Sequence, residues 1–210
     1  MDRIDLTQWI ALAAALGLAS GVRLYAVLLV LGLVGRYDLA PLPHAFAPLS
    51  HPLVLGAAAF MVLVELLADK IPAVDTLWDS VHTFIRIPAG AALAAAVFGG
   101  APTEWTIAAG ILGGSLAATS HFAKAGTRVA VNASPEPLSN FLVSTLEDFG
   151  VGGLLWLAFA HPWVAIAAVA ICVVLALVLL HALVKLVRGG VRRLFPPRGE
   201  AGEGSRGPAR

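Results

Sequence analysis

Charge is scarce in this sequence. Only 13% of its 210 residues are Asp, Glu, Lys or Arg, against about 25% in a typical soluble domain. Cys172 is the only cysteine, which excludes a disulfide or a cysteine-based metal site within one chain. The sequence also has no Walker loop, no Gly-x-Ser-x-Gly elbow and no His-Glu-x-x-His motif. An ATPase module and a soluble cofactor module are therefore excluded. We expect no cofactor.

Long apolar runs take the place of charge. Hydrophobic residues make up 59% of the chain, the mean hydropathy is +0.85, and several runs reach the roughly 20 residues that a spanning helix needs. This pattern predicts an all-α integral membrane protein with about six transmembrane helices. The second and third spans are short, and the third gains length if it continues back through Pro88. The expected spans are Leu6–Val34, Pro52–Leu67, Ile85–Gly100, Trp105–Val131, Leu138–Ala160 and Pro162–Val187.

The basic residues are unevenly distributed. Seven of the 14 Lys and Arg lie between Lys185 and Arg210. Residues 1–188 therefore form the expected transmembrane domain, and residues 189–210 a basic tail expected to be disordered. Counting basic residues near the span ends favours both termini on the cytoplasmic side of the inner membrane. No folded basic surface accompanies the tail, so we expect no nucleic-acid partner.

The first apolar run contains an arginine, Arg23, where a charge costs about 2.5–3.5 kcal/mol even on gentle insertion scales. A similar Gly-x-Arg occurs in the fourth run, so that Gly21 and Arg23 align with Gly126 and Arg128. Three spans per repeat would invert the second copy, as in many transporters. We therefore expect two inverted halves, at about residues 6–101 and 105–187.

Buried arginines need partners. The candidates are Glu65, Asp69, Glu147 and Asp148, or a bound anion. His121 and Lys124 share a helix face with Arg128 and either bind an anion or pair with acids of a neighbouring helix. Asn132 is a further candidate for lining a pathway.

A polar stripe precedes the third span. Asp75, Asp79, His82 and Arg86 follow helical spacing, with apolar residues opposite them. This pattern predicts an amphipathic helix on the cytoplasmic side, which either lies at the membrane interface or lines a water-filled vestibule. Asp75, Asp79 and His82 are candidate ligands for a divalent metal. The alternative is a solvated helix face without a specific role.

The strings "SGVRLY", "VELLADKIPAVDTLWDSVHTFIRIPAG", "HFAKAGTRVAVNASPEPLSN" and "STLEDFG" resemble an uncharacterised, mainly bacterial membrane family, the domain of unknown function four-one-two-six. The resemblance covers about residues 8–185. It implies a small multi-pass membrane domain, and no activity or catalytic residue.

Three functions fit these features. The first is transport of a small ion or charged solute, as a channel or secondary carrier, with His82 and His121 as candidates for proton-linked gating. The second is a membrane-embedded metal-dependent enzyme or binder of a phospholipid headgroup. The third is a scaffold subunit whose charges only hold helices together. We favour transport and no enzymatic activity, with membrane lipids as partners and a homo-oligomer as an open possibility.

Overall fold

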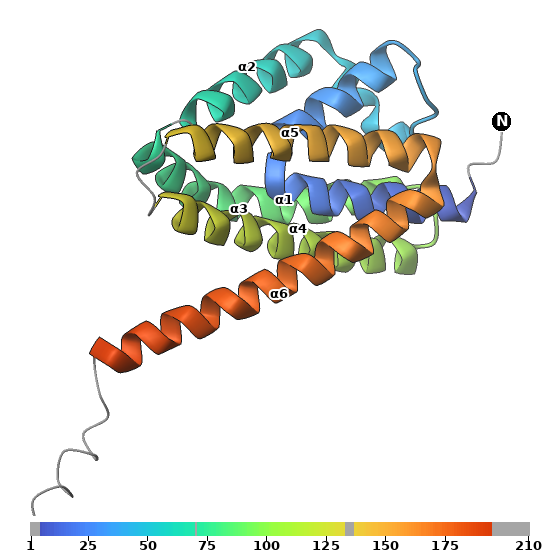
Figure 1. The fold of residues 1–210 in the computed structure, drawn as a ribbon. Helices are drawn as coiled ribbons and strands as arrows, with labels where there is room; N and C mark the ends of the chain where they lie inside the picture. Colours follow the sequence, from blue (N-terminus) through green and yellow to red (C-terminus); the bar gives the residue numbers. More distant parts are fainter. Residues whose placement is uncertain (1–4, 70, 133–136, 195–210) are drawn as a thin grey trace, which may run out of the picture.

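The computed structural model describes residues 5–69, 71–132 and 137–194. All regular secondary structure in this part of the chain is helical, with six α-helices, one 3-10 helix and no strand (Figure 1). Four α-helices begin with proline, which suits the first turn because it lacks the N–H that would have no partner there. The elements are α1 (Leu6–Arg36), η1 (His44–Ser50), α2 (Pro52–Ala68), α3 (Pro72–Val97), α4 (Thr103–Asn132), α5 (Pro137–Ala160) and α6 (Pro162–Leu194).

Four segments of the described chain are long and apolar enough to cross a membrane. The bent pair η1 and α2, at 74°, makes a fifth candidate. The six spans and the two inverted halves expected from the sequence are therefore not confirmed. The four segments are Leu6–Arg36, Val74–Val97, Phe141–Ala160 and Pro162–Gly189.

The polar stripe before the third expected span is not a separate interfacial helix. It forms the first half of α3, which runs without a break through Pro88. The stripe is buried, whereas Leu77, Val81 and Phe84 on the same helix are 67%, 53% and 82% exposed. A solvated polar face is therefore the wrong interpretation. This helix turns its charges inward and its apolar side chains outward, as expected for a helix surrounded by lipid.

Helix α1 is two helices joined at Arg23, whose backbone is not helical (φ −143°, ψ 72°). The chain reverses direction there, so that the second half of α1 returns toward the end of the bundle where the first half began (Figure 1). At that end Trp9 packs edge-on against Phe98, and Gln8 lies within 3.4 Å of the Phe159 carbonyl. We call this the N-terminal end of the bundle; the α2–α3 turn and the C-terminal end of α6 lie at the opposite end.

Packing contacts place the end of α1 at the N-terminal end as well. Gly35 packs against Ser50 of η1, and Ala45 of η1 lies next to Gly99, just after α3. At about 1.5 Å per residue, the halves of α1 are about 25 and about 20 Å long, so neither crosses a hydrocarbon core of about 30 Å. The helix is therefore built as a hairpin that enters the bundle and turns back inside it.

The first half of α1 lies in the centre of the bundle, in contact with α3, α4 and α5. Small residues allow this close approach. A Cβ on Gly21 would lie 2.2 Å from the Ala117 carbonyl oxygen, and one on Gly113 would lie 2.2 Å from the Ala94 Cβ. Gly21 thus brings α1 close to α4 next to the turn at Arg23, and Gly113 brings α4 close to α3.

Candidate functional site

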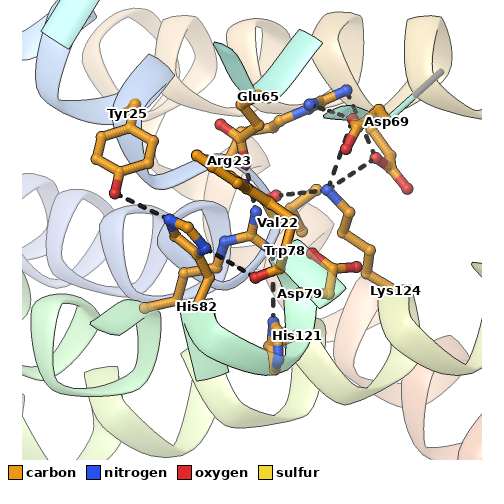
Figure 2. Close-up of polar contacts among 12 residues, drawn as sticks. Val22, Arg23, Tyr25, Glu65, Asp69, Trp78, Asp79, His82, His121 and Lys124 are labelled. Atoms are coloured by element: carbon orange, nitrogen blue, oxygen red, sulfur yellow. Dashed lines mark hydrogen bonds and ion pairs between the residues drawn. The ribbon is translucent and has the colours of Figure 1, made fainter. Parts of the chain in front are cut away.

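The tip of the α1 hairpin lies in a group of charged side chains that we call the central cluster. Its members come from α1, the α2–α3 turn, α4 and α5, and Figure 2 shows several of them converging. The central cluster consists of Arg23, Asp69, Lys124, Arg128, Glu147 and Asp148.

Two carboxylates connect the cations of the central cluster. Asp69 Oδ2 forms an ion pair with Arg23 Nη1 and lies 3.5 Å from Arg128 Nη2 and 3.9 Å from Lys124 Nζ. Asp69 is fully buried in the turn after α2. Burial by itself would raise the pKa of the Asp69 carboxyl, but the three cations hold that pKa below its ordinary value.

Glu147 is the second shared acid. Its Oε2 lies 3.0 Å from Arg128 Nη2, 3.4 Å from Lys124 Nζ and 3.7 Å from Arg23 Nη2. The two arginines that the Gly-x-Arg alignment paired therefore meet at the same two carboxylates. Sequence analysis predicted these partners, and the structure brings them together.

The break in α1 adds polar contacts of its own. Carbonyls before a helix break lose their donors four residues ahead, and Lys124 Nζ donates to one of them, the Val22 oxygen, at 3.2 Å. Arg23 donates to Ser144 Oγ at 2.7 Å and pairs with Asp148 at 2.8 Å. Lys124 of α4 therefore satisfies a buried backbone carbonyl at the break, and α5 provides partners for the Arg23 side chain.

A second group, the Arg86 cluster, consists of Glu65, Asp79, Thr83, Arg86 and His121. Arg86 is fully buried and forms ion pairs with Glu65 and with Asp79 Oδ1, the latter at 2.7 Å. His121 Nδ1 faces Arg86 Nη1 at 3.5 Å, and Nε2 lies 2.7 Å from Thr83 Oγ1. Because Arg86 can only donate, this contact assigns the acceptor role to Nδ1 and the proton to Nε2.

His82 has different partners. Its Nδ1 lies 2.8 Å from the Trp78 carbonyl and therefore donates, which leaves Nε2 to accept from the Tyr25 hydroxyl at 3.0 Å (Figure 2). The side chains of Asp75, Asp79 and His82 thus do not converge. The part of the chain that the structure describes contains no group of three or more His, Cys, Asp or Glu placed to hold a metal ion. We therefore do not assign these residues as metal ligands.

Two cavities reach the charged groups from different sides. One of about 490 Å³ lies among α1, α4, α5 and α6, is mostly apolar, and has Lys124 and Glu147 in its lining. The other, of about 250 Å³, lies between α3 and α4 and is lined in part by Asp79, His121 and Arg128. Small molecules therefore have space beside the charges from both directions.

The predicted residues divide between the two clusters. Six form the central cluster, and Glu65 and His121 belong to the Arg86 cluster, while the side chain of Asn132 lies outside the described residues. Sequence analysis missed Arg86 and Ser144 as members of the site. Arg86 could have been found from its place on the polar stripe; Ser144 gave no signal, because a serine on an apolar helix is common.

A sequence model of the family described as "Domain of unknown function (DUF4126)" matches residues 10–182 of the chain. No curated protein and no solved structure matches it. The match covers the described helices from α1 into α6, and with them both clusters.

Proposed function

The chain belongs to the DUF4126 family, whose description gives no activity. We propose that it moves a small ion or charged solute across a membrane as a channel or secondary carrier. The apolar helices of the structure indicate a membrane protein. Ionisable groups are rare in membrane-spanning helices, and those that occur face the interior of the bundle and usually mark an ion or substrate pathway. We propose that the protein lies in the cytoplasmic (inner) membrane.

The observation that carries the proposal is the broken helix α1. Irregular backbone at membrane depth is tolerated only where it is buried in protein or lines a cavity, and discontinuous helices form the binding sites of many transporters. The break falls at Arg23, whose side chain meets Asp69 and Asp148. The break in the backbone of α1 and the charged side chains of the central cluster therefore lie at the same place in the bundle.

Each charged group has a role in this proposal. Arg23 and Arg128 set the central electrostatics, and Asp69, Glu147 and Asp148 neutralise them or bind a cation in transit. The two cavities are the natural approaches, because one is lined by Lys124 and Glu147 and the other by Arg128. His82 and His121 stay candidates for proton-linked gating, since histidine titrates near neutral pH.

The scaffold alternative is supported by the many ion pairs, which satisfy each of the four buried cations of the described chain. Against it stands the surplus of acid: the two clusters and Asp75 together contain six carboxylates and four cations. A network that only holds helices together needs no carboxyl groups in excess of its cations. The headgroup alternative loses its metal site, because Asp79 is engaged by Arg86.

The hairpin in α1 changes the topology that we propose. With α1 as a hairpin, we propose that α2 to α6 each cross the membrane, α4 being 30 residues long although it is not one of the four apolar segments above. Five crossings place the N-terminus and the C-terminus on opposite sides, in place of the two cytoplasmic termini expected from the sequence. The C-terminal end of α6, with Lys185 and Arg188, and the α2–α3 turn then share one side, which the positive-inside rule assigns to the cytoplasm. The other side has Arg36 together with Asp5, Asp38 and Glu104.

The inverted repeat has partial support. Arg23 and Arg128 share two acids, as equivalent positions around a pseudo-two-fold axis would. However, Arg23 lies at a helix break and Arg128 within the continuous α4. A common ancestor of the two halves therefore requires that one half changed its helix geometry.

The test is ion flux into proteoliposomes that contain the purified protein, with potassium, magnesium, chloride and phosphate screened separately. We expect selective flux for one of them. Arg23→Ala and Arg128→Ala should each abolish this flux, while Arg36→Ala, an exposed arginine outside both clusters, should leave it unchanged. No flux of any of the four ions from folded wild-type protein would count against transport and in favour of the scaffold.

A further inference from the structure

Asp75 is the one acid of the polar stripe that the ion pairs leave out. It lies in the first turn of α3 and is fully buried. Among the described residues, no hydrogen-bond donor reaches either of its carboxylate oxygens, and no cation lies within ion-pairing distance. An ionised carboxylate in this position would be costly, because burial removes its hydration without replacing it.

The charged neighbours of Asp75 come from three elements. They are Asp69 in the α2–α3 turn, Asp79 on α3 and Arg128 on α4. Arg128 is already bound to Asp69 and Glu147, and Asp79 is bound to Arg86. The side-chain hydrogen bond assigned to Asp75 is with another acid, the carboxyl group of Asp69.

Two adjacent carboxyl groups that cannot both ionise share a proton. The three cations around Asp69 favour its ionised form, so the proton belongs to Asp75. A neutral Asp75 carboxyl can donate its O–H to Asp69, whose Oδ1 also lacks a donor among the described residues. One proton thus supplies the missing hydrogen bond and removes the unpaired charge.

We propose that Asp75 is a proton-binding site that couples transport to a proton gradient. This inference rests on the proposed function and names the driving ion. In the protonated state the Asp75 carboxyl group keeps its O–H and donates it to Asp69. When the proton leaves to water, the new carboxylate attracts Arg128, which weakens the hold of Arg128 on Asp69 and Glu147 and loosens the central cluster.

In this proposal the proton reaches Asp75 from the cavity between α3 and α4. The cavity between α3 and α4 is lined by Thr76, Asp79 and Arg128, so it passes the residue next to Asp75 and two of its charged neighbours. Water in this cavity can carry a proton to and from the carboxyl group. The larger cavity contains Lys124 and Glu147, so proton and solute approach the central cluster from different sides.

The first experiment measures protonation directly, by infrared difference spectroscopy of the protein in lipid. A protonated carboxyl group has a C=O stretch separate from the carboxylate bands. We expect this band at neutral pH in wild type, its loss in Asp75→Asn, and its retention in Asp38→Asn, the same substitution at an exposed acid. Absence of the band from wild type, or its persistence in folded Asp75→Asn, would overturn the assignment.

The second experiment separates this inference from the proposed function. Flux of the transported ion in proteoliposomes is measured with and without an imposed pH gradient. We expect the gradient to drive flux in wild type and Asp38→Asn, and to have no effect in Asp75→Asn. If flux through the wild-type protein does not change with the pH gradient, proton coupling is overturned, but the proposal of transport still stands. An infrared band assigned to Asp75 without any flux supports the proton site and overturns transport.

Discussion

Replacing Arg86 by methionine would leave two buried carboxylates without their cation. Arg86 is fully buried, Glu65 is 1% exposed and Asp79 is 4% exposed, so neither carboxylate is well hydrated once the guanidinium is removed. Methionine keeps much of the volume of the arginine side chain and removes its charge. The substitution therefore isolates the electrostatic part of the interaction.

The expected loss follows from the number of contacts. Breaking a buried ion pair by removing one partner costs about 3–5 kcal/mol. Arg86 has two such partners, and His121 Nδ1 also faces it. We expect Arg86→Met to lower the free energy of unfolding by at least the lower end of that range, about 3 kcal/mol.

The assay is denaturant unfolding of the purified protein in detergent micelles, with Arg36→Met as the matched control on an exposed arginine. A triple variant, Glu65→Gln, Asp79→Asn and Arg86→Met, should recover most of the loss because no uncompensated charge is then buried. Equal stability of Arg86→Met and Arg36→Met would refute the reasoning. So would a triple variant less stable than Arg86→Met, since the cost would then not come from the unpaired acids.

Two further predictions concern packing and topology. Gly113→Ala should destabilise the protein by about 1–3 kcal/mol, because its Cβ would meet the Ala94 Cβ at 2.2 Å, whereas Gly56→Ala, with nothing within 4 Å of the new Cβ, should be neutral or stabilising in the same unfolding assay. In a Cys172→Ser background, a membrane-impermeant maleimide added to intact cells should label both Asp5→Cys and Asp38→Cys but not Ser205→Cys. Labelling of Asp38→Cys without Asp5→Cys would fit the six-span topology and contradict the hairpin.

Part of the site could be predicted because rare residues in an apolar chain are informative. Arg23 and Arg128 stood out against their surroundings, and the acids predicted as their partners, Asp69 and Glu147, are the ones they contact. An unpaired charge in a membrane is expensive, so the few available opposite charges had to be its partners. This argument needs no knowledge of the fold.

The metal candidates show where such reasoning fails. Asp75, Asp79 and His82 share a helix face, but each turns to a different neighbour: the Asp69 carboxyl, Arg86 and Tyr25. Helical spacing establishes which side chains project together. It does not establish which groups other helices place opposite them, and those groups decide whether the side chains converge on one ion.

The sequence by itself determined that this chain is helical, that it belongs in a membrane, and which residues carry charge inside it. These properties depend on composition and on periodicity along the chain. Only the tertiary structure decided that α1 turns back at Arg23 and that the stripe of α3 faces the core. Hydropathy measures how long an apolar run is, but a break within it becomes stable only when Lys124, Ser144 and Asp69, far away in sequence, supply the missing polar contacts.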